Sequence, residues 1–139
     1  MPILNVVLST PPDIAQSSII AAKLSQLTAA ILHKDPVLTS VAISHIAPAH
    51  WFVAGSSLDE QGKTSFFLDI RITDETNTAR EKANYIAAVF KTMSELLGHL
   101  HDTSYIHIHD ARATAWGYAG LTQQYRAVQK AMGDSRIDV

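Results

Sequence analysis

Cysteine is absent from this chain of 139 residues. Its absence excludes disulfide bonds, zinc sites built on thiolates and catalysis by a cysteine nucleophile. The same absence leaves the redox compartment of the protein unspecified.

An excess of positive charge is also missing, because 11 Lys and Arg stand against 13 Asp and Glu and give a formal net charge of -2. This balance provides no positive field for a phosphate backbone, so we expect no nucleic-acid partner. The first residues lack a basic leader region, and Lys or Ser interrupts the longest apolar segments. We therefore expect a soluble, cytoplasmic protein without membrane association.

The residues that are present are sufficient for one compact core. Hydrophobic residues make up 47% of the chain and charged residues 17%, which is far from the composition of disordered proteins. A chain of this length buries roughly two thirds of its unfolded surface on folding. Residues 1–139 are therefore expected to form a single domain.

The first half predicts a strand, a helix, a strand and a short strand, at residues 2–8, 11–34, 39–47 and 51–54. Thr10 is the expected cap of the helix, with Pro11 at its first position. The second half repeats the order, with a strand, a helix, a strand and a short third helix at residues 65–72, 79–97, 104–109 and 121–132. Thr78 and Glu81 have the spacing of a capping box at the start of the second helix.

The repeated order indicates two β-α-β units, at about residues 2–54 and 64–110, followed by a C-terminal segment, 111–139. A long helix between two strands connects a parallel pair with a right-handed crossover. We therefore expect an α+β fold with a four-stranded mixed sheet and two helices on one face. The other face would be bare in a monomer, which predicts a homo-oligomer.

Motifs of nucleotide-binding and hydrolytic enzymes are missing, since the sequence has no Walker A loop and no GxGxxG, HExxH or GxSxG motif. Seven histidines raise the question of a metal site, and His107 and His109 would share one face of a strand. Because the spacing fixes no third ligand, we expect no metal.

Pro2 is the most informative residue of the sequence. Removal of Met1, which is usual before a small second residue, would expose a secondary amine at the start of a strand. An α-amino group has a pKa near 8, and burial or nearby cations lower this value. Such a proline can be neutral at physiological pH and accept a proton. The simpler interpretation is that Pro2 only begins an edge strand.

With Pro2 behind Met1 and two strand-helix-strand halves, the chain resembles the tautomerase superfamily. Residues 41–57 (VAISHIAPAHWFVAGSS) look like the strand, proline turn and short strand of the macrophage migration inhibitory factor group. Residues 105–118 (YIHIHDARATAWGY) look like that group's strand, small-residue loop and Gly-aromatic end. The similarity spans about residues 2–120. It implies the duplicated tautomerase fold of the fused members, which include cis-3-chloroacrylate dehalogenase and form homotrimers with sites at subunit interfaces.

The resemblance also implies roles for single residues. Pro2 matches the catalytic base of the family. Arg71 falls where dehalogenase-like members place an arginine that binds a carboxylate, and a guanidinium does so with two parallel hydrogen bonds. Lys34, with His33 as the alternative, lies near the lysine that follows the first helix in the migration inhibitory factor group. An outward-facing strand arginine is the simpler interpretation of Arg71.

Three further positions match the pocket of the family. Tyr105 corresponds to a pocket tyrosine of the migration inhibitory factor group, and His107 stands where the same strand carries Asn or Tyr. Trp116 occupies a position on the apolar wall, with a buried interface indole as the alternative interpretation.

Together these matches imply a cofactor-independent keto-enol tautomerase, an isomerase acting on small 2-oxo acids. Pro2 would move the proton, Arg71 would anchor the carboxylate, and Lys34 or His107 would stabilise the enolate. One alternative is a non-enzymatic trimer that binds a ligand or a partner. Another is a hydratase or dehalogenase of 3-substituted acrylates, although the second arginine and the water-activating glutamate of those enzymes have no match in this sequence.

Overall fold

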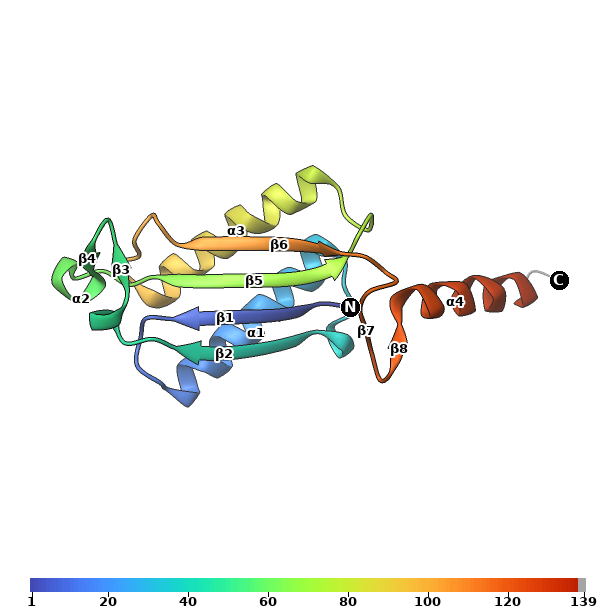
Figure 1. Cartoon of the computed structure of the whole chain (residues 1–139), viewed down its shortest axis with the longest axis horizontal. Coiled ribbons are helices and arrows are strands. Elements are labelled where there is room, and N and C mark those ends of the chain that lie inside the picture. Colours follow the sequence, from blue (N-terminus) through green and yellow to red (C-terminus); the bar gives the residue numbers. More distant parts are fainter. Residues whose placement is uncertain (138–139) are drawn as a thin grey trace.

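Four strands form a mixed sheet in the order β2-β1-β5-β6 in the computed structural model, which describes residues 1–137 and the side chains of residues 1–133. The strands are β1 (Ile3–Leu8), β2 (Ser40–His45), β5 (Phe66–Thr73) and β6 (Tyr105–Ala111). β1 is parallel to β2 and β5 is parallel to β6, while the two central strands, β1 and β5, are antiparallel (Figure 1). The predicted α+β fold with a four-stranded mixed sheet is confirmed.

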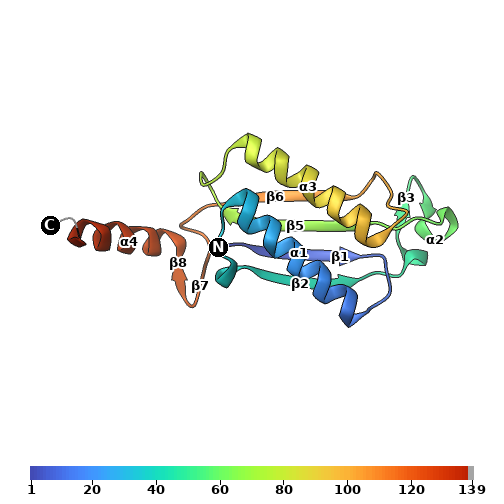
Figure 2. The same cartoon turned by 180° about the vertical axis from the view of Figure 1, so that it is seen from behind.

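The two long helices, α1 (Ile14–Leu32) and α3 (Ala79–Leu97), cover the same face of the sheet (Figure 2). Strand residues that alternate along the chain point into this layer, and they form one buried cluster with apolar residues of both helices. A polar contact between the two helices lies beside this cluster, where the hydroxyls of Thr28 and Tyr85 are 2.9 Å apart. Thr28 also donates to the carbonyl of Leu24 over 2.7 Å, so the hydroxyl pair links α1 to α3.

The residues that cap the N-termini of the two long helices include one that was predicted correctly and one that was not. Thr78 and Glu81 form the predicted capping box at the start of α3. Thr10 does not cap α1. Asp13 does, and its carboxylate accepts the backbone N–H of Ala15 over 3.0 Å. The reason is that Pro12 follows Pro11 directly. A residue that precedes a proline is kept out of the α region, so the helix cannot begin at Pro11.

The remaining elements are short, apart from the last helix. They are η1 (Pro36–Leu38), η2 (Pro48–His50), β3 (Phe52–Val53), β4 (Ser56–Ser57), α2 (Leu58–Gln61), β7 (Gly117–Tyr118), β8 (Leu121–Thr122) and α4 (Gln123–Ile137). The helix α2 lies in a segment for which the sequence predicted no helix or strand, and α4 is longer than the short helix predicted at residues 121–132. No described helix is long and apolar enough to cross a membrane.

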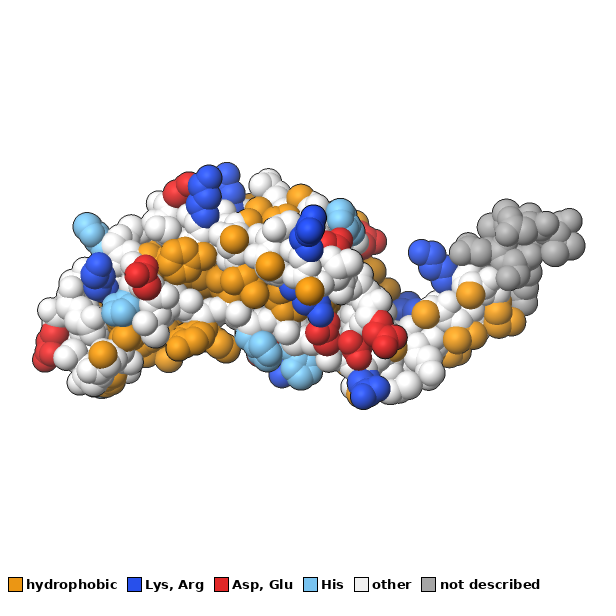
Figure 3. All heavy atoms as spheres, turned by 90° about the horizontal axis from the view of Figure 1, so that it is seen from above, with side chains coloured by type: hydrophobic (Ala, Val, Ile, Leu, Met, Phe, Trp, Pro, Cys, Tyr) orange, Lys and Arg blue, Asp and Glu red, His pale blue; other side chains and the backbone are white. Residues whose placement is uncertain are grey.

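Two surfaces are exposed in the described part of the chain. One is the face of the sheet opposite α1 and α3, here called the open face, which carries the side chains of Ile3, Asn5, Val7, Phe67, Asp69, Arg71, Tyr105, His107 and His109. The other is α4, which extends away from the body of the molecule (Figure 3). Four apolar side chains at helical spacing on it or just before it are 40% to 51% exposed, namely Leu121, Tyr125, Val128 and Met132.

Candidate active site

A cavity of 370 Å³, here called the N-terminal cavity, opens beside Met1. The N-terminus lies at the end of the sheet from which α4 extends (Figure 1). Its wall comes from the N-terminal residue, the segment after α1, the segment after β5, and the C-terminal hairpin with α4. The polar and charged side chains among the described lining residues are Lys34, Thr73, Thr76, Tyr118, Gln123, Arg126 and Lys130.

The sheet register explains why these distant segments meet. β1 and β5 are antiparallel with Ile3 opposite Arg71, so the start of β1 lies beside the end of β5. The helix α1 returns the chain to the start of the parallel strand β2, and its C-terminus therefore lies at the same end of the sheet.

Met1 lines the cavity, and Pro2 is the next residue of the chain. Pro2 is buried, and its carbonyl accepts the backbone N–H of Ser40 over 3.1 Å. While Met1 is attached, the nitrogen of Pro2 is an amide and has no basicity. Burial lowers the pKa of the Met1 amine, the cation of Lys34 lowers it further, and Asp35 opposes both effects.

Lys34 enters the cavity because of the way α1 ends. His33 closes the helix in the left-handed conformation with φ 58. The imidazole Nε2 of His33 lies 3.1 Å from the Glu81 carboxylate. The ammonium of Lys34 instead donates to the hydroxyl of Thr76 over 2.8 Å, inside the cavity. Burial lowers the pKa of Lys34, against the opposing effects of Glu81 and Asp110.

The helix α4 contributes three polar side chains that the sequence analysis did not propose. Gln123 donates its amide N–H to the sulfur of Met1 over 2.8 Å. The guanidinium of Arg126 lies 3.7 Å from the centroid of the Tyr118 ring and donates to the Tyr118 carbonyl over 3.1 Å. Lys130 follows one turn later. The signal was present in the sequence, because Gln123, Arg126 and Lys130 have the spacing of one helix face.

Trp116 lies at the border of the cavity. Its indole N–H donates to the hydroxyl of Thr73 over 3.3 Å, and Thr73 lines the N-terminal cavity. Trp116 itself lines a neighbouring cavity of 330 Å³ on the hairpin of β7 and β8. The indole therefore supports the wall through Thr73.

Of the six predicted site residues, Lys34 is the one that lines the cavity. Besides Pro2 and Trp116, three others lie on the open face of the sheet. Arg71 and His107 are exposed on the open face. The Nδ1 atom of His107 is 3.7 Å from a buried oxygen of Asp69 that has no hydrogen-bond partner. Tyr105 pairs with Phe67, whose partner on β1 is Val7, so it lies about 16 Å from Pro2 along the strands.

No protein-family model matches the chain, and no curated protein matches it in sequence. Solved structures do match it over nearly their whole length. Native fused 4-OT is 21% identical, with a TM-score of 0.78 and coverage of 90% of this chain and 98% of that one. A fused 4-OT described as a symmetric trimer is 20% identical, with a TM-score of 0.76 and coverage of 88% and 96%. The chain has the tautomerase fold. A macrophage migration inhibitory factor-like protein of Entamoeba histolytica matches at 15% identity, with a TM-score of 0.72 and coverage of 87% and 97%.

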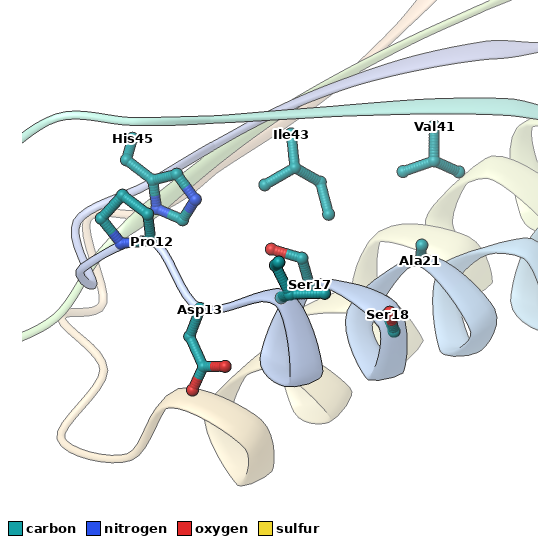
Figure 4. A pocket seen from close by; sticks show the side chains of 9 residues that line it. Pro12, Asp13, Ser17, Ser18, Ala21, Val41, Ile43 and His45 are labelled. Carbon is teal, nitrogen blue, oxygen red and sulfur yellow. The ribbon is translucent and has the colours of Figure 1, made fainter.

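A larger hollow of 630 Å³ lies between α1 and the edge strand β2 (Figure 4). Val41, Ile43 and His45 point from β2 toward small side chains of α1, such as Ser17. The Nδ1 atom of His45 is 2.8 Å from the Thr10 carbonyl, so this nitrogen is already engaged. The hollow is an open, mostly apolar groove, and the N-terminal cavity is the one that gathers cations. Among the described residues, no three His, Asp or Glu side chains are close enough together to hold a metal ion.

Proposed function

We propose that the chain, once Met1 is removed, is a cofactor-independent keto-enol tautomerase that acts on small 2-oxo acids. The observation that carries the proposal is that Pro2, which is buried, directly follows Met1, and Met1 lines a cavity together with Lys34. The tautomerase fold supports the proposal at the level of architecture.

The chemistry follows from the surroundings of the N-terminus. Burial and Lys34 lower the pKa of the amine of Met1. Once Met1 is removed, Pro2 carries the N-terminal amine, and we expect the same two causes to lower its pKa. A neutral proline nitrogen can take a proton from the enol oxygen or from carbon and return it at the other position. Lys34 would stabilise the negative oxygen that develops during this transfer.

We further propose a homotrimer with sites at the subunit interfaces. The open face and the apolar stripe of α4 are the surfaces that neighbouring copies would cover. Because Tyr105 lies at the far end of its own sheet, it could line only a neighbour's cavity. His107, which also lies on the open face, would likewise contribute to the cavity of a neighbouring copy. Arg71 and Arg126 are alternative candidates for the arginine that binds the carboxylate of the ligand.

A non-enzymatic binding protein is the second candidate, and the contact that holds Met1 favours it. The sulfur of Met1 is held by Gln123, and a chain that keeps this residue has no basic nitrogen at Pro2. A hydratase or dehalogenase would use the same cavity with a protonated proline, and it would release halide from 3-chloroacrylates.

The test begins with an intact mass of the purified protein, which shows whether Met1 is present. The processed chain is then assayed with the enols of phenylpyruvate and 2-hydroxymuconate, alongside Pro2→Ala. Loss of turnover in the variant, by about a hundredfold or more for removal of a general base, supports the proposal. Full activity in Pro2→Ala would show that proline is not the base.

A further inference from the structure

The N-terminal cavity is a local concentration of positive charge in a protein whose formal net charge is -2. Lys34, Arg126 and Lys130 line it, and none of the described lining residues is acidic. Cations that gather at a concave site without carboxylates are the arrangement expected for binding an anion.

Arg126 is held in a fixed position within this cavity. Its guanidinium lies over the Tyr118 ring, and one of its terminal nitrogens donates to the Tyr118 carbonyl. Its Nε atom is buried without a hydrogen-bond partner. Among the described side chains, no carboxylate forms an ion pair with it. A guanidinium fixed by its ring face and one N–H keeps the remaining donors for a planar anion.

The position of Arg126 relative to the N-terminus fits a small ligand. Gln123 touches Met1 and lies one turn before Arg126 on the same helix face, which is about 4.5 Å along the axis. An anionic group at Arg126 would thus lie in the same cavity as the N-terminal residue. The cavity of 370 Å³ accommodates a molecule of that size.

We infer that Arg126 binds the carboxylate of the ligand, so that the C-terminal helix, and not the sheet, makes the cavity selective for acids. The inference rests on the proposed function for the nature of the ligand, an organic acid. It goes beyond the proposed function in assigning the selectivity to α4.

The experiment measures binding of two inert probes of the same shape, cinnamate and cinnamamide, to the processed full-length chain by NMR titration. We expect cinnamate to bind at least tenfold more tightly than cinnamamide. In Arg126→Ala the affinity for cinnamate should fall about tenfold or more, because a charge-assisted hydrogen bond is lost. The affinity for the amide should stay within twofold, so the preference for the acid disappears.

Two further variants separate charge from folding. Arg126→Lys keeps the positive charge but cannot donate two parallel hydrogen bonds to a carboxylate. This variant should retain part of the preference for cinnamate over cinnamamide. Arg80→Ala removes an exposed arginine at the start of α3 and should leave both affinities unchanged. Circular dichroism and thermal unfolding establish that each variant is folded.

Failure of this inference is distinguishable from failure of the proposed function. A wild-type chain without preference for the acid, or an Arg126→Ala chain that keeps it, would overturn the inference even if the enzyme turns over enols. A chain that catalyses no tautomerisation but loses its acid preference in Arg126→Ala would retain the inference and refute the proposed function.

Discussion

The side-chain amide of Gln123 donates a hydrogen bond to the sulfur of Met1 over 2.8 Å, which ties the first turn of α4 to the N-terminal residue. The N-terminal residue and the start of the C-terminal helix therefore meet at one cavity. Removal of Met1 would therefore expose the amine of Pro2 and also remove a contact of the C-terminal helix.

Retention of Met1 should abolish catalysis. Replacing Pro2 by Leu, whose bulk at the second position prevents removal of the initiator residue, is expected to give a folded chain without tautomerase activity. Mass spectrometry verifies that Met1 is present. If this chain is as active as the processed wild type, the amine of residue 2 has no part in the reaction.

Removal of the Lys34 charge should raise the pKa of the N-terminal amine. Burial is the largest cause of the lowered pKa of the Met1 amine, and the Lys34 cation is the second. In the processed chain the base is active when neutral, so activity rises with pH through the pKa of Pro2. For Lys34→Met we expect this limb of the pH–rate profile to move to higher pH. The exposed Lys23 provides the matched control, and Lys23→Met should leave the profile in place.

Loss of the hydroxyl pair in the core should destabilise the fold. Tyr85→Phe leaves the Thr28 oxygen without a donor in a buried place, which costs about 1–2 kcal/mol of unfolding free energy. Urea unfolding at pH 7 measures this, and Thr28→Val with Tyr85→Phe completes a double-mutant cycle. A coupling energy near zero would show that the hydroxyls do not support each other.

The same tyrosine should produce a loss of stability at alkaline pH. Burial is the main cause that raises the pKa of Tyr85 from 10.0 to about 12, and the hydrogen bond between Tyr85 and Thr28 opposes it. Since the folded pKa exceeds the unfolded one, the contribution is complete below pH 10 and declines as the pH rises from 10 toward about 12. Unfolding curves between pH 8 and pH 11 should show this decline in the wild type and less of it in Tyr85→Phe.

A charge on the open face should prevent assembly. Phe67 lies there beside Val7 and Tyr105, and a glutamate at this position would have to lose its hydration on burial against another copy. Phe67→Glu is expected to sediment as a monomer at micromolar concentration, and the wild type as a trimer. Lys91→Glu, on the exposed side of α3, should sediment as the wild type does. A trimeric Phe67→Glu chain would place the interface elsewhere.

Local patterns in the sequence were sufficient to predict the four strands of the sheet, the two long helices and the capping box of Thr78 and Glu81, because each depends on residues close together in the chain. The cap of α1 was predicted at Thr10 and lies at Asp13. That error arose from the restriction that a second proline imposes on the first, which outweighs the capping preference of a threonine.

The sequence by itself determined the order of elements, the crossover of each β-α-β unit and the presence of Pro2 at the start of a strand. Only the tertiary structure decided which side chains share a cavity, because the antiparallel register of β1 and β5 brings the N-terminus, Lys34 and α4 to one end of the sheet. The same register turns Arg71 and His107 onto the open face and carries Tyr105 to the far end. Periodicity is a property of neighbouring residues, whereas a cavity is formed by segments that the chain joins only when it folds.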